Sequence, residues 1–231
     1  MESITWKTEH YGFKSFGELV YAPESYKLSR IIHKDYPEVK KILSNGHEYD
    51  LTTNIFSKLP NIFSDFKIDS EEYVQIFGRV NNNRVYKWIK KKYIVDHPNL
   101  NKYKVLLPKS NGSGEFGEVL STPLIAAPNV GHTQTFISIG SFDSEFEAKS
   151  ALKYISTKFA RALLGTLKVT QDNKKAAWAK IPMQDFTDLS DINWEKSTSE
   201  IDKQLYLKYN FSGEEIRFIE ENVTEMSLDL D

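Results

Sequence analysis

Two Glu-x-Lys triplets, at residues 38–40 and 147–149, have the spacing in this sequence that best fits catalysis. In metal-dependent nucleases such a triplet works with an aspartate to hold Mg²⁺ and a water molecule. That chemistry needs a strand, whereas Glu38 follows a proline in a helical context and Glu147 belongs to a predicted helix cap. A small Mg²⁺-dependent nuclease is therefore kept as an alternative. The five histidines show no metal-ligand spacing, and without cysteine a zinc site is not credible.

A glycine loop provides a second candidate. Gly112, Gly114 and Gly117 form a G-x-G-x-x-G pattern after a predicted strand, as in dinucleotide-binding sites. Such a site needs a long helix after the third glycine, and Pro123 and Pro128 leave no room for one. The pattern favours a surface turn or a loop that contacts phosphate.

The third candidate is a run of amide and guanidinium side chains at residues 79–84, with the sequence RVNNNR. Arginine pairs with guanine and asparagine with adenine through two hydrogen bonds in the major groove of DNA. The alternative is that the three asparagines merely favour left-handed turn geometry. Two flanking arginines and the lysines that follow favour binding.

The elements that position these residues follow from hydrophobic periodicity. Residues 72–78 and 85–95 predict two strands that form a hairpin with residues 79–84 at its tip. A strand at 103–107 leads into the glycine loop, and another covers 136–139. A helix is then predicted from a capping box at Ser144 to Gly165, with Lys149, Lys153, Thr157 and Arg161 on one face.

The C-terminal part differs in kind. Two capping boxes, Ser197 with Glu200 and Ser212 with Glu215, predict an acidic helical hairpin that packs on the preceding domain. We expect an α+β fold: a mixed sheet with hairpins and a packed basic helix, followed by this hairpin. The predicted domains are a DNA target recognition domain over residues 1–183 and a helical extension over residues 184–231.

Composition and charge limit the function classes. The 231 residues are 40% hydrophobic and 27% charged, without cysteine, which predicts an ordinary soluble chain with a real core. No signal peptide or apolar run near membrane length is present, so we expect a cytoplasmic protein without a membrane partner. Residues 76–110 carry a charge of +8 and residues 184–231 a charge of −9. This polarity suggests one face for nucleic acid; the alternative is two solvated surfaces.

Four stretches carry a family resemblance: GSGEFGEVLSTPLIAAP, TQTFISIGSF, the run from EAKSALKYISTKFARALLG to QDFTDLSDINW, and EIDKQLYLKYNFSGEEIRFIEENV. They are similar to the C-terminal part of fused type II restriction and modification enzymes with an adenine-specific DNA methyltransferase. In that family, this part is the target recognition domain. The resemblance covers residues 77–226 well and the first 75 residues loosely.

The resemblance implies specificity without catalysis. The methyltransferase motifs, a glycine-rich S-adenosylmethionine loop and Asn/Asp-Pro-Pro-Tyr/Phe, are absent from this sequence. We therefore expect a non-catalytic chain, either a fragment or a free-standing relative, that needs no cofactor of its own. S-adenosylmethionine and Mg²⁺ are implied only for the parent enzyme, whose methyltransferase and nuclease domains would be partners beside double-stranded DNA. A protein–protein interaction domain with an acidic tail remains a further alternative.

The expected DNA contacts fall into two groups. Phosphates are assigned to lysines and one arginine: Lys87, Lys90, Lys109, Lys153 and Arg161. Base edges are assigned to the hairpin tip, the glycine loop and one strand: Arg79, Asn81, Asn82, Asn83, Arg84, Asn111, Ser113 and Gln134.

Overall fold

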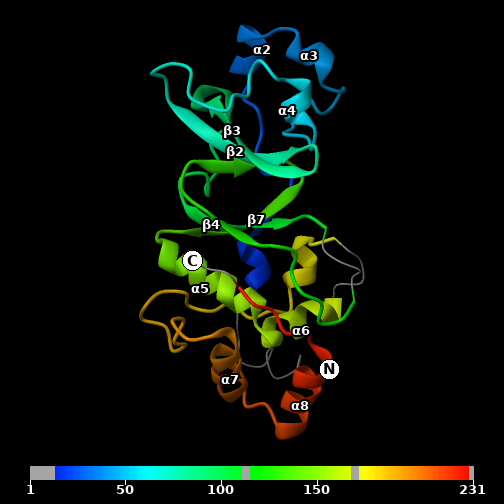
Figure 1. The fold of residues 1–231 in the computed structure, drawn as a ribbon, viewed down its shortest axis with the longest axis vertical. Coiled ribbons are helices and arrows are strands. Elements are labelled where there is room, and N and C mark those ends of the chain that lie inside the picture. Colours follow the sequence, from blue (N-terminus) through cyan, green and yellow to red (C-terminus); the bar gives the residue numbers. More distant parts are fainter. Residues whose placement is uncertain (1–13, 111–114, 168–171, 229–231) are drawn as a thin grey trace.

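The computed structural model describes residues 14–110, 115–167 and 172–228. It is a stack of layers along the long axis of the molecule (Figure 1). Three short helices cover one end, two β-sheets follow, and further helices form the other end. Within the described residues, seven strands and seven α-helices confirm the mixed α+β prediction. Every helix in this part of the chain is too short or too polar to span a bilayer.

The first sheet carries the predicted hairpin. Its strand order is β3-β2-β6, formed by β2 (Tyr73–Val80), β3 (Asn83–Lys90) and β6 (Val130–His132). Strand β3 ends earlier than predicted, because residues 91–93 form a 3₁₀ turn, η2 (Lys91–Tyr93). Asn81 and Asn82 connect the strands with φ angles of 49° and 64°. A two-residue turn with both residues left-handed matches the twist of the strands, which fixes the position of the tip.

Short helices cover the outer face of this hairpin sheet. They are α2 (Ile31–Asp35), α3 (Val39–Ile42) and α4 (Ile55–Lys58). Their buried apolar side chains, with those of β2 and β3, form one of the two large hydrophobic cores. This end of the molecule is therefore scaffold for the hairpin.

The second sheet has the order β1-β7-β4-β5 and is antiparallel. Its strands are β1 (Val20–Tyr21), which follows η1 (Phe16–Leu19), β4 (Tyr103–Pro108), β5 (Leu124–Ala126) and β7 (Phe136–Phe142). Phe77 of the hairpin sheet meets Phe136 of this sheet, with ring centroids 4.5 Å apart. These two rings belong to a small core that joins the sheets.

The predicted basic helix is interrupted, and Gly165 does not end it. The structure has α5 (Glu145–Ser156) and α6 (Lys158–Leu167), separated at Thr157, whose ψ of 152° is extended. The Thr157 hydroxyl accepts a hydrogen bond from the amide of Ala160, and the Asp202 carboxylate accepts bonds from the amides of Lys158 and Phe159. These acceptors satisfy the free N–H groups of a new helix start, so α6 begins in a new direction.

The C-terminal helices share a core with the sheet above them. Both predicted capping boxes are present, at the starts of α7 (Thr198–Lys208) and α8 (Gly213–Asn222). Phe159 of α6 stacks on Tyr209 at a centroid distance of 5.2 Å, and Tyr154 of α5 contacts Trp194. The buried residues of β4, β7 and α5 to α8, together with η3 (Lys175–Trp178), form one cluster. A boundary at residue 183 therefore does not separate two cores.

Candidate nucleic-acid interface

The hairpin tip holds two arginines face to face. Arg79 and Arg84 are direct partners on the antiparallel ladder of β2 and β3. Arg79 is exposed, whereas Arg84 is half-buried and donates hydrogen bonds of 2.6 Å and 2.5 Å to the carbonyl and hydroxyl oxygens of Thr122. The Arg84 guanidinium also lies over the ring of Phe136, 5.6 Å from its centroid. The tip is thereby attached to the loop before β5 and to the second sheet.

The two guanidinium groups repel each other. Burial lowers the pKa of Arg84, and the charge of Arg79 lowers it further. Within the described residues, neither arginine has an ion pair with a carboxylate. Like charges directly opposite each other on a ladder destabilise the pair. An anion bound between them would remove that cost.

The three asparagines of the tip are all exposed. Asn81 and Asn82 occupy the left-handed turn, so the turn geometry alone accounts for these residue types. Asn83 already belongs to β3 and pairs with Val80. Their amide groups are accessible for base contacts, and the turn holds them at the end of a rigid hairpin.

The lysines that follow the tip are paired with an acidic segment that precedes the hairpin. Lys87 lies 2.5 Å from a carboxylate oxygen of Asp65, and Lys90 lies 2.5 Å and 2.6 Å from those of Asp69 and Glu71. These two carboxylates raise the pKa of Lys90. Three further ion pairs neutralise other lysines of the basic run: Lys91 with Glu72, Lys92 with Glu71, and Lys102 with Asp143.

Ion pairing and burial leave only a few cations of the basic run available to bind an anion. Lys104 is fully buried, where its ammonium group donates to the carbonyls of Leu100 and Val130 and burial lowers its pKa to about 7. Apart from the buried Lys104, the cations of residues 76–110 without a carboxylate partner in the described structure are Arg79, Arg84 and Lys109.

These three cations belong to one edge of the molecule, which we call the tip edge. Arg84 covers Phe136, and Phe136 pairs with Pro108 at the end of β4. The next residue, Lys109, is exposed, and its amide donates to the carbonyl of Thr135 at 2.9 Å. Two of the predicted loop contacts, Asn111 and Ser113, lie outside the described residues.

Gln134 lies at the junction of the sheets, where it braces the N-terminal layer. Its side-chain amide donates to the Asp50 carboxylate at 3.0 Å, and its backbone amide donates to the carbonyl of Leu51. Asp50 also accepts hydrogen bonds from Lys27 and His47. The described contacts of Gln134 are thus structural, although its side chain is partly accessible.

Two predicted phosphate contacts, Arg161 and Lys153, do not fit their positions. Arg161 is 2% exposed, and its guanidinium donates to the carbonyls of Ser156, Gly117 and Glu118, while burial lowers its pKa to about 10. The Lys153 ammonium group donates to the carbonyls of residues 194–196. The Arg161 guanidinium faces the interior, whereas the partly exposed Lys153 ammonium group is engaged by the segment that precedes α7.

The candidate catalytic residues lie in helical settings. Glu38 immediately precedes α3, and Glu147 in the first turn of α5 accepts a hydrogen bond from the Ser144 hydroxyl. Neither is on a strand. Among the residues that the structure describes, there is no group of three histidine or acidic side chains that could hold a metal ion.

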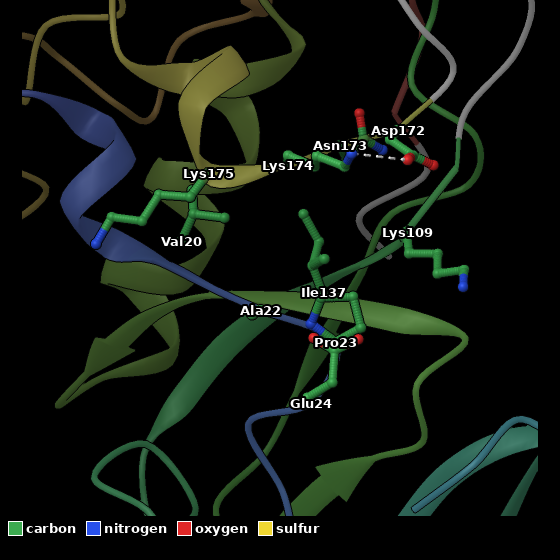
Figure 2. A pocket seen from close by; sticks show the side chains of 10 residues that line it. All are labelled: Val20, Ala22, Pro23, Glu24, Lys109, Ile137, Asp172, Asn173, Lys174 and Lys175. Carbon is green, nitrogen blue, oxygen red and sulfur yellow. Dashed lines mark ion pairs between the residues drawn. The ribbon is translucent and has the colours of Figure 1, made fainter.

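A cavity of about 340 Å³ adjoins the tip edge at Lys109. Figure 2 shows Ala22, Pro23 and Ile137 on one side of it and residues 172–175 on the other. No local pattern in the sequence predicts this cavity, because its walls come from β1, β7 and the segment before η3, which are distant along the chain. Thr122, the partner of Arg84, was likewise not foreseen.

The chain was compared with protein families, curated proteins and solved structures. No family model, no curated protein and no solved structure matches it.

Proposed function

We propose that this chain is a sequence-specific double-stranded DNA recognition domain of a restriction-modification enzyme and acts in the cytoplasm. It would place separate adenine methyltransferase and nuclease domains on their target, and S-adenosylmethionine and Mg²⁺ would serve those domains. The family resemblance of residues 77–226 supports this proposal. The observation that carries it is the tip edge, where the unpaired cations of the basic run gather.

The paired arginines favour an anionic ligand. Arg79 and Arg84 face each other without a carboxylate between them, and this arrangement costs stability in the free protein. A phosphate or a guanine edge offers the acceptor oxygens that guanidinium groups bind with two hydrogen bonds. Binding of DNA would therefore compensate for the repulsion.

The geometry supports a proposal of different roles for the tip residues. Arg84 is held by Thr122 and Phe136, so it positions the hairpin and presents the remaining face of its guanidinium. Arg79 and Asn82 are exposed and are the stronger candidates for base edges, while Lys109 suits a phosphate. Lys87 and Lys90 can contact phosphates only after exchange of their exposed carboxylate partners.

A binding titration tests this function. Fluorescence anisotropy with a labelled random duplex would be recorded at about 50 mM and 200 mM salt for the wild type, Lys109→Ala and the control Lys40→Ala, since a phosphate contact makes affinity salt-dependent. Lys40 is exposed on α3, remote from the tip edge. We expect Lys109→Ala to lower the affinity and reduce the salt slope by about 0.9, and the control to match the wild type. A folded wild type that binds no duplex at the lower salt would refute the proposal.

A further inference from the structure

The cavity beside Lys109 combines an apolar surface with a cationic rim. Its apolar side is formed by Val20, Ala22, Pro23 and Ile137, and its rim includes three lysines and two carboxylates: Lys109, Lys174, Lys175, Glu24 and Asp172. Figure 2 shows Lys109 and Lys175 on opposite sides of the cavity, with their ammonium groups directed away from each other. A volume of about 340 Å³ suits a small ligand with one flat apolar part.

The walls of the cavity are held in place by hydrogen bonds. The backbone amide of Asn173 donates to the carbonyl of Lys109 at 2.7 Å, and its side chain donates to the carbonyl of Pro108 at 2.9 Å. The Ser110 hydroxyl donates to the Asp172 carboxylate at 3.1 Å. The segment before η3 is thereby joined to the end of β4, the strand that leads to the tip edge. The cavity is a preformed part of that edge.

We propose that this cavity binds a nucleotide, whose base lies against Pro23 and Ile137 and whose phosphate is held by Lys109 and Lys174. A base provides a flat apolar face, and its phosphate provides the anion that the rim favours. The ion pair of Lys174 with Asp172 is 3.5 Å long and solvent-exposed, so it can give way to a phosphate.

The source of the nucleotide is a base that has left the stack of DNA bound at the tip edge. This source rests on the proposed function, whereas the chemistry of the pocket does not. Unstacking is easiest at a mismatched base pair, so a mismatched duplex is the most sensitive probe. Free adenosine 5′-monophosphate tests the pocket without DNA.

The test uses a variant that fills the cavity. Ala22 lines the cavity and is exposed, so Ala22→Phe places a ring there without entering a core; Ala127→Phe, at another exposed alanine, is the matched control. Two probes are used: adenosine 5′-monophosphate in calorimetry, and a duplex with one mismatched 2-aminopurine, which fluoresces more strongly when unstacked. The wild type and Ala127→Phe should bind both probes and raise the fluorescence. Ala22→Phe should lose the fluorescence rise and bind each probe roughly tenfold more weakly.

The outcomes separate the two proposals. If the wild type binds the intact duplex but neither binds adenosine 5′-monophosphate nor raises the fluorescence, the pocket is refuted and the recognition function stands. If it binds adenosine 5′-monophosphate but no duplex, the pocket stands and the DNA source is refuted. Equal behaviour of Ala22→Phe and Ala127→Phe on both probes would also overturn the pocket.

Discussion

Arg79 is the residue at which stability and binding should oppose each other. Because it faces Arg84 without a carboxylate partner in the described structure, Arg79→Ala removes a repulsion from the ladder. We expect the free energy of unfolding to stay the same or rise by roughly 0.2–1 kcal/mol, while the affinity for duplex DNA falls. Urea denaturation and anisotropy of the same samples measure the two effects.

Arg84→Ala is the informative comparison. It removes the same like-charge contact but also the two hydrogen bonds to Thr122 and the contact with Phe136. We expect it to lower the free energy of unfolding by about 1 kcal/mol, because one partner of a bonded pair is lost. If both variants change stability equally, the two arginines have equivalent structural roles and our division of roles is wrong.

The asparagines of the tip require a substitution that keeps the turn. Asn82 has a φ of 64°, so alanine would strain the backbone, whereas glycine suits this conformation. If the Asn82 amide reads a base, Asn82→Gly should reduce discrimination between the cognate and a scrambled duplex by about 1–3 kcal/mol without loss of stability. An unchanged discrimination would make Asn82 an ordinary turn residue.

At the scale of elements, residue patterns identified the hairpin and the helix caps. The alternation in β2 and β3 and the Ser/Glu capping boxes are local signals, and the structure confirms them. The break between α5 and α6 depends on Asp202, 44 residues after Lys158, and no local pattern contains it. The acids that neutralise Lys87 and Lys90 lie just before β2, so these ion pairs could have been predicted from the sequence. A charge count that begins at residue 76 omits them.

Asp202 should make stability depend on pH. Burial raises its pKa to about 7, against the opposing effect of the two amides that donate to it; nearby Glu220 raises the pKa further and Arg161 lowers it. Because this value lies above that of an unfolded aspartate, the folded state binds more protons between about pH 4 and pH 7. The contribution of Asp202 to the free energy of unfolding is therefore largest at low pH and falls as the pH rises through 7, by at most about 1.4 kcal/mol per pH unit.

The variant Asp202→Asn isolates this effect. Asparagine cannot titrate and still offers one oxygen to the start of α6. The free energy of unfolding of the wild type should therefore fall relative to that of the variant between pH 5 and pH 7.5, roughly the window set by the pKa shift. Urea denaturation at both pH values measures it. Parallel changes in the wild type and the variant would show that Asp202 does not titrate in this range.

At the scale of the whole molecule, residues 184–231 share a hydrophobic core with the second sheet. Ile201, Leu205 and Ile219 are fully buried in the cluster that also contains residues of β4 and β7. Removal of residues 184–231 should expose this core, and we expect the truncated chain to lose its cooperative thermal unfolding transition. Circular dichroism measures the loss; a cooperative transition in the truncated chain would support the boundary predicted at residue 183.

The position of the candidate site also emerges only at this scale. The hairpin tip could be predicted from residues 72–95, but Thr122 and Phe136 contact it only through the packing of one sheet on the other. Arg161 and Lys153 have residue types that suit a phosphate, but tertiary packing buries the first and engages the second with backbone carbonyls of residues 194–196. Residue type identified candidates, and only the arrangement of layers decides which of them share a surface.

Sequence-specific recognition at the tip edge is tested most directly by a paired titration. A cognate duplex selected from random sequences and a scrambled duplex would be titrated with the wild type, Arg79→Ala and the control Arg217→Ala, whose side chain is exposed on α8. We predict that Arg79→Ala reduces the ratio of cognate to scrambled affinity by roughly 5- to 150-fold, the equivalent of one bidentate base contact, and that the control leaves it unchanged. If selection yields no preferred sequence, or if the ratio is the same for Arg79→Ala and the wild type, the tip edge does not read DNA sequence.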